Sequence, residues 1–168
     1  MKRVGPRKRV ETKKRRSEYD PTWTIFTDGS VKGAECGSGF CVLYEEEVVY
    51  EEGFSVTVPK GIADPVAYCE LFAVLCALRW AGEQMLYDER IVLYCDNNFI
   101  VNNMRGVCSK LSDWPGIEEY LKLRSGFHRY RVILNHEKDN LAHETSRRAR
   151  NDTDVYVDLM WKTQVYYD

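Results

Sequence analysis

Residues 23–30 decide the fold and read Trp23-Thr24-Ile25-Phe26-Thr27-Asp28-Gly29-Ser30. The aromatic and β-branched residues that lead up to Asp28 are typical of a β-strand, and Gly29 predicts that this strand ends there. We therefore expect the Asp28 carboxylate at the carboxyl end of a strand. Ligand sites in open sheets with parallel strands form at such ends.

Two further carboxylates are expected close to the first. The run before Asp96 is continuously apolar, Ile91-Val92-Leu93-Tyr94-Cys95. Such a run suits a parallel strand that is covered on both faces. Between the two strands, residues 67–81 predict a helix, because small and apolar residues follow Glu70 at steps of three and four: Ala73, Val74, Ala77, Leu78 and Ala81. Glu70 is thus expected on the buried face of that helix.

Asp28, Glu70 and Asp96 stand where apolar residues would be expected. A buried charge is costly unless it is paired or bound to a metal. Like charges brought together also push protons onto one another. A divalent cation with oxygen ligands removes both penalties, so the pattern predicts a hard-metal site. The alternative, that each carboxylate merely caps a turn or a helix, accounts for any one of them more readily than for all three.

The remaining pattern predicts an α/β fold. Strands are expected at 37–44, at 48–58 after a hairpin tip of three glutamates, and at 130–134. Further helices are expected at 97–107, from 114 onward and at 138–150, and Asp64 before Pro65 is a plausible N-cap for the long helix. This order predicts a five-stranded mixed sheet flanked by helices. Strands one to three are antiparallel, and strands four and five run parallel to strand one.

Bulk composition indicates one globular domain, which we place at residues 21–150. The chain has 168 residues, 44% of them hydrophobic and 30% charged. No apolar run approaches the ~20 residues of a membrane span, so no membrane partner is expected. The six cysteines form no CxxC pair. We expect reduced, buried thiols in an intracellular protein rather than a zinc site.

Charge is distributed unevenly along the chain. Nine of the 24 basic residues but only one of the 26 acidic residues lie in residues 1–17, which leaves +8 there and −10 in the rest. We expect residues 1–20 to form a disordered basic arm. The arm suits phosphate binding or nuclear import, or it is a solvated tail or the linker of a longer protein. Residues 151–168 form an extension for which the pattern predicts no structure.

The motifs together resemble the ribonuclease H type I family. They are Thr27-Asp28-Gly29-Ser30, the glycine-rich strand after it, Glu70-Leu71-Phe72-Ala73, Tyr94-Cys95-Asp96-Asn97 and Asp139-Asn140-Leu141-Ala142-His143. The resemblance spans residues 22–150. It implies a five-stranded ribonuclease H-like sheet and an endonuclease that hydrolyses the RNA strand of RNA–DNA hybrids with two Mg²⁺ ions. The basic arm suits either a free-standing enzyme or a domain of a reverse transcriptase polyprotein.

The resemblance also implies roles for four residues. Asp28 would bridge both ions, and Glu70 and Asp96 would hold the ion on the leaving-group side. His143 stands where many family members have Asp, and it would help to hold the ion that activates water. Imidazole is softer than carboxylate, so His143 could favour Mn²⁺ or carry a proton near neutral pH. Glu144 is the alternative fourth residue, and a helix-surface role for His143 also stays open.

Substrate binding is expected at residues beside this site. Gly29, Ser30, Asn97 and Asn98 are candidates for reading 2′-hydroxyls across the minor groove. His136 could approach a phosphate from a shortened loop, whereas His128 is expected on the surface. Six basic residues form either a modest phosphate-binding face or a solvated one: Arg105, Lys110, Lys122, Arg124, Arg129 and Arg131.

One departure from the family pattern keeps other functions open. The Asn-rich pair that some members carry before the helix glutamate is replaced by Val66-Ala67. A nuclease of the same fold could therefore act on another polynucleotide. A non-catalytic module that binds nucleic acid or protein is the remaining alternative. The three carboxylates argue against that module, because a retired site has no reason to keep them.

Overall fold

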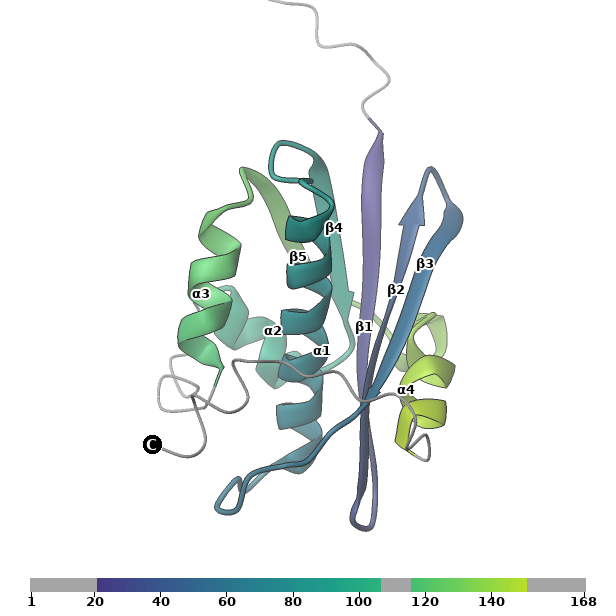
Figure 1. Cartoon of the computed structure of the whole chain (residues 1–168), viewed down its shortest axis with the longest axis vertical. Coiled ribbons are helices and arrows are strands. Elements are labelled where there is room, and N and C mark those ends of the chain that lie inside the picture. Colours follow the sequence, from purple (N-terminus) through teal and green to yellow (C-terminus); the bar gives the residue numbers. More distant parts are fainter. Residues whose placement is uncertain (1–20, 107–115, 151–168) are drawn as a thin grey trace, which may run out of the picture.

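The computed structural model describes residues 21–106 and 116–150 (Figure 1). The predicted basic arm of residues 1–20 and the extension of residues 151–168 therefore lie outside the described residues, as does Lys110. Within the described range the predicted α/β architecture is confirmed.

The five strands form one mixed sheet in the order β3-β2-β1-β4-β5. Strands β1, β2 and β3 are antiparallel, and β4 and β5 run parallel to β1, as predicted. Their bounds are β1 Thr22–Lys32, β2 Glu35–Tyr44, β3 Glu47–Ser55, β4 Arg90–Cys95 and β5 Arg129–Leu134. The hairpin between β2 and β3 turns at Glu45 and Glu46, which both have positive φ angles. The third strand is shorter than the predicted 48–58.

Helices cover both faces of the sheet (Figure 1). Their bounds are α1 Pro65–Glu83, α2 Asn98–Met104, α3 Ile117–Ser125 and α4 His143–Arg150, with a 3₁₀ turn η1 at Glu137–Asp139. α1 packs against β1 and β2, and α3 lies beside it. α4 packs across β1, β2 and β3. Ser38 of β2 faces α1, whereas its neighbours Gly37 and Gly39 face α4, so these two helices lie on opposite faces.

Helix α1 is the core helix of the fold. Asp64 is its N-cap, as predicted, because its side chain accepts a hydrogen bond of 3.0 Å from the N–H of Ala67. Pro65 occupies the first turn, where it sacrifices no helical hydrogen bond. Within the described residues, α1 alone is long and apolar enough to cross a membrane. Most of it is buried inside the protein, as expected for the core helix of a globular domain.

The prediction that β1 ends at Asp28 is wrong. β1 continues to Lys32, and Gly29 and Ser30 stay in register with Ser38 and Gly37 of β2. The strand that ends is β4, whose last residue, Cys95, pairs with Thr27. Asp28 is therefore the first residue of β1 beyond the parallel pairing with β4.

The prediction of one helix over residues 138–150 is also wrong. The structure divides this segment into η1, an extended residue at Asn140, a turn at 141–142, and α4, which begins at His143. Asn140 causes the break: its backbone is extended, its Oδ1 accepts from the N–H of Ala142, and its Nδ2 donates to the carbonyl of Thr27. The amide thus ties the chain to β1 just before α4 starts.

Three glycines of the sheet form the surface against which α4 packs. A Cβ atom on Gly37 would lie 2.4 Å from the carbonyl oxygen of Ser146, and one on Gly39 would lie 2.9 Å from the nitrogen of Ser146. A Cβ on Gly53 would lie 2.9 Å from the Cβ of Ala149. Only glycine permits this close approach of helix and sheet. The glycine-rich second strand therefore sets the depth at which α4 sits.

The prediction of buried, unpaired thiols is confirmed for the described residues. Five cysteines are unpaired and buried: Cys36, Cys41, Cys69, Cys76 and Cys95. Burial raises the pKa of the Cys41 thiol to about 11. Such a thiol stays protonated at neutral pH, which agrees with a packing role.

Candidate metal centre

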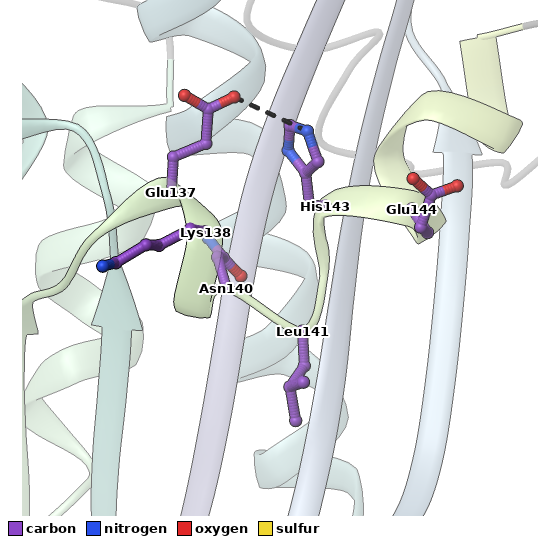
Figure 2. A pocket seen from close by; sticks show the side chains of 6 residues that line it. All are labelled: Glu137, Lys138, Asn140, Leu141, His143 and Glu144. Carbon is purple, nitrogen blue, oxygen red and sulfur yellow. Dashed lines mark ion pairs between the residues drawn. The ribbon is translucent and has the colours of Figure 1, made fainter.

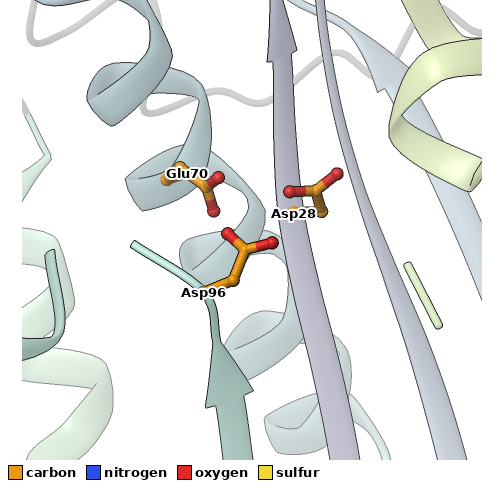
Figure 3. Close-up of side chains that lie close together, drawn as sticks. All are labelled: Asp28, Glu70 and Asp96. Atoms are coloured by element: carbon orange, nitrogen blue, oxygen red, sulfur yellow. The ribbon is translucent and has the colours of Figure 1, made fainter. Parts of the chain in front are cut away.

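Asp28, Glu70 and Asp96 meet at one point, as the sequence predicts. One carboxylate oxygen from each residue lies within 4.8 Å of the others (Figure 3). Asp28 and Glu70 are both 3% exposed, and Asp96 is half-buried. The cluster is thus open to solvent chiefly at Asp96.

Each carboxylate reaches the cluster for a local reason. Asp28 lies beside the end of β4, and Asp96 directly follows that end. Glu70 comes from α1, which lies unusually close to β1. A Cβ on Gly29 would lie 2.5 Å from the nitrogen of Glu70, so glycine is required for this approach. The Gly29 backbone N–H then donates to the Glu70 carboxylate.

Electrostatics disfavour three ionised groups here. Burial raises the pKa of the Glu70 carboxyl well above its ordinary value, and the charges of Asp28 and Asp96 raise it further. Burial and the charge of Asp28 also raise the pKa of Asp96, against a lowering by the Asn140 amide. The cluster therefore tends to retain a proton unless positive charge is supplied.

Cys95 does not offer a second reactive group. Its Sγ lies 3.7 Å from Oε2 of Glu70. Burial and then the charge of Glu70 raise the pKa of this thiol well above its ordinary value. A neutral thiol is a weak hydrogen-bond donor and a poor metal ligand, so the donor set at this site is made of oxygens.

His143 is the first residue of α4 and contacts the cluster through Asp28. Its Nδ1 lies 3.1 Å from Oδ2 of Asp28, and its Nε2 lies 3.5 Å from Oε1 of Glu137. Glu144, the alternative fourth residue, is instead exposed and lies 4.0 Å from Arg147. Figure 2 shows Glu137 and His143 turned toward one another, with Glu144 apart from them. Of the two candidates, His143 is the one that contacts the carboxylate cluster.

An open pocket of about 490 Å³ adjoins His143. Its lining residues are Glu137, Lys138, Asn140, Leu141, His143 and Glu144 (Figure 2). It therefore lies on the side of the cluster from which α4 approaches. Glu137 also acts on the carboxylates, because its charge contributes to the raised pKa of Asp96.

The predicted substrate-binding residues have different surroundings. The Ser30 hydroxyl accepts a hydrogen bond of 2.9 Å from Arg150, and the Asn97 side chain caps α2 through the N–H of Ile100 at 3.1 Å. Asn98 is exposed beside it. His136 is exposed and precedes η1, and it is not among the residues that line the pocket.

Part of the predicted basic face serves the fold instead. Arg105 donates twice to the carbonyl of Val132, at 3.2 and 2.9 Å, and Arg124 donates to the carbonyl of Met104 at 3.1 Å. Both guanidinium groups therefore tie secondary-structure elements together. His128 is on the surface, as predicted, where its Nδ1 lies 2.8 Å from Oδ1 of Asp88.

Sequence reasoning missed two residues of the site. Ser146 is fully buried, and its hydroxyl donates to Oδ2 of Asp28 at 2.6 Å. Asn140 links Asp96 to the Thr27 carbonyl, with Nδ2 3.3 Å from Oδ2 of Asp96. The available signal for Ser146 was its spacing, because residues three apart on a helix share a face and His143 was already a candidate.

Comparison of the sequence and comparison of the structure with known proteins give different results. The sequence matches no protein-family model, and it is not significantly similar to any curated protein. The structure, in contrast, superposes on type 1 RNase H enzymes. RNase H1 from the halophilic archaeon Halobacterium salinarum gives a TM-score of 0.64 at 18% identity, over 76% of this chain and 96% of that chain.

Two structures that contain an RNA/DNA hybrid are also similar. LC11-RNase H1 gives a TM-score of 0.64 at 20% identity, over 76% of this chain and 95% of that one. The foamy viral protease-reverse transcriptase gives 0.54 at 12% identity, over 88% of this chain and 22% of that one. At these identities the likeness establishes architecture. The chain therefore has the fold of type 1 ribonuclease H.

Proposed function

We propose that this chain is a metal-dependent endoribonuclease that hydrolyses the RNA strand of RNA–DNA hybrids. The observation that carries the proposal is the cluster of Asp28, Glu70 and Asp96, with oxygens within 4.8 Å of one another, on a ribonuclease H fold. A scaffold role gives no reason to hold two buried carboxylates beside a third one. Hydrolysis of a phosphodiester gives such a reason.

The residues fit Mg²⁺ as the cofactor. The donor set consists of carboxylate oxygens, which Mg²⁺ prefers. Burial and the neighbouring carboxylate charges raise the pKa of Glu70 and of Asp96, and a bound cation would offset that penalty. Asp28, Glu70 and Asp96 would hold two ions together with His143, and Mn²⁺ would suit the imidazole. When bound, such ions activate a water and stabilise the charge on the leaving oxygen.

The remaining site residues position these ligands. The Gly29 N–H fixes the Glu70 carboxylate, and the Asn140 amide fixes Asp96 to β1. Nδ1 of His143, when it carries a proton, donates to Oδ2 of Asp28, while Nε2 faces Glu137. A histidine held between two carboxylates is placed to carry a proton between the site and solvent.

Strand labelling tests this function. A hybrid labelled on either the RNA or the DNA strand is incubated with the protein in Mg²⁺, in Mn²⁺ and in chelator. We expect cleavage within the RNA strand only, and only with metal present. Cleavage of the DNA strand, or cleavage that persists in chelator, would contradict the proposal.

One observation favours a second candidate, a nuclease that acts on another polynucleotide. Val66 in the first turn of α1 is 42% exposed, and its side chain offers no hydrogen bond to a 2′-hydroxyl. Substrates in which RNA residues carry 2′-O-methyl or 2′-fluoro groups separate the two. Hybrid cleavage that is unaffected by these groups would favour the second candidate.

A further inference from the structure

Ser146 contacts the cluster from the interior of the protein. Its side chain is fully buried, and its hydroxyl lies 2.6 Å from Oδ2 of Asp28 and 2.9 Å from the carbonyl of His143. The backbone of Ser146 is held by the preceding turn of the chain and by the sheet. Its backbone N–H bonds to the carbonyl of Ala142, and Gly39 of β2 lies directly against its nitrogen.

The hydroxyl has one proton and two acceptors within reach. A hydrogen bond from a hydroxyl to a carboxylate is stronger than one to a carbonyl, and 2.5–2.7 Å is about its usual length. The 2.6 Å contact with Asp28 therefore takes the proton while the carboxylate is ionised. The His143 carbonyl, at 2.9 Å, is the second acceptor that the same hydroxyl can reach.

This contact determines how Asp28 faces the site. Oδ2 accepts from Ser146 and lies 3.1 Å from Nδ1 of His143. Figure 3 shows one oxygen of Asp28 turned toward Glu70 and Asp96 and the other turned away from them. A carboxylate held in one orientation loses less side-chain entropy when it binds a cation.

We infer that Ser146 is a positioning residue that orients the Asp28 carboxylate for cation binding. The inference rests on the proposed metal-dependent function. Ser146 touches neither substrate nor metal in this role, and it acts through Asp28. Residues that orient metal ligands typically contribute about 10- to 100-fold in metal affinity.

The test measures Mn²⁺ binding without nucleic acid, through the paramagnetic resonance signal of free Mn²⁺. We expect Ser146→Ala to raise the half-saturating Mn²⁺ concentration about tenfold. Ser146→Cys keeps the shape of the side chain but carries a bulkier, weakly donating thiol, and it is expected to bind Mn²⁺ as poorly as Ser146→Ala. In hybrid cleavage, the Mg²⁺ concentration for half-maximal rate should rise while KM for the hybrid stays unchanged.

Ser38→Ala is the matched control. Ser38 is also fully buried, but its hydroxyl donates to the backbone carbonyl of Cys69 at 2.7 Å. This variant should lose similar thermal stability and keep wild-type Mn²⁺ binding. A folded Ser146→Ala or Ser146→Cys protein with unchanged Mn²⁺ binding would overturn the inference, as would a wild-type protein that binds no Mn²⁺. Wild-type Mn²⁺ binding without hybrid cleavage would instead reject the proposed function alone.

Discussion

At the scale of single residues, Glu70 is the group whose charge the fold tolerates least. It is 3% exposed and faces two other carboxylates. Burial and the charges of Asp28 and Asp96 raise its pKa, so the metal-free protein favours the protonated, neutral form of this carboxyl group. A function that needs a cation at this place explains why the residue is nevertheless acidic.

Glu70→Gln should therefore stabilise the metal-free protein and inactivate it. The amide keeps the shape and the hydrogen bonds but removes the charge, so the midpoint of thermal unfolding at pH 7.5 should rise by about 4 °C, which corresponds to about 1 kcal/mol. Differential scanning calorimetry in chelator measures the shift. Glu83→Gln on the same helix is the control. A midpoint of Glu70→Gln below that of the wild type would show that the ionised Glu70 side chain stabilises the fold.

His143 gives a second prediction at this scale. His143→Asp supplies a harder ligand at the same place beside Asp28. We expect the ratio of Mg²⁺- to Mn²⁺-supported cleavage to rise in this variant, and activity with either metal to fall about 10²-fold or more in His143→Ala. Glu144→Gln is the control, because Glu144 faces Arg147 in solvent. Equal loss in the control would make Glu144 the fourth site residue.

At the scale of elements, helix α4 carries His143 and Ser146, and the sheet determines its position. α4 packs against a surface formed by Gly37, Gly39 and Gly53. A short helix cannot hold itself at a fixed depth, so the glycine surface does so. The geometry of the site therefore depends on residues that touch no ligand.

Gly39→Ala should displace α4 and lower activity while the sheet stays folded. Its new Cβ would lie 2.9 Å from the nitrogen of Ser146, and such overpacking typically costs about 1–3 kcal/mol. Circular dichroism follows folding, and hybrid cleavage follows the site. Gly126→Ala is the matched control, since its Cβ would have ordinary contacts at 3.4 Å. Wild-type activity in Gly39→Ala would mean that the depth of α4 is unimportant.

The sequence predicted the elements better than their ends. Strand β4 and the N-cap of α1 follow from local signals, the apolar run at 91–95 and Asp64 before Pro65. Local propensity predicts a strand end at Gly29, although the missing side chain of this residue serves the close approach of α1. Local propensity does not report such a tertiary contact. The same limit applies to Asn140, whose partner Thr27 is 113 residues away.

At the scale of the whole molecule, the site opposes the stability of the fold. The folded-state pKa values of Glu70 and Asp96 are raised above those of the unfolded chain. When these carboxyl groups are protonated they add to the free energy of unfolding. That contribution is complete below the pKa of the unfolded chain, about 4, and it is lost as the pH rises through the raised pKa values of the folded protein. The metal-free protein is thus weakened by this site at neutral and alkaline pH.

Chemical unfolding at several pH values in chelator tests this linkage. From pH 8 toward pH 5, the free energy of unfolding of the wild-type protein should rise relative to that of Glu70→Gln. Added Mg²⁺ should stabilise the wild type more at pH 8 than at pH 5, because the cation competes with protons for the same oxygens. A pH dependence that is identical in the two proteins would show that Glu70 does not titrate in this range.

The central claim is that the three carboxylates form the catalytic site of a ribonuclease H. The most direct measurement compares wild type and Asp96→Asn on an RNA–DNA hybrid, an RNA duplex and a DNA duplex of one sequence in Mg²⁺. The account predicts that the wild type cuts the RNA strand of the hybrid alone and that Asp96→Asn cuts nothing. A folded wild-type protein that leaves the hybrid intact in Mg²⁺ and in Mn²⁺ would contradict it.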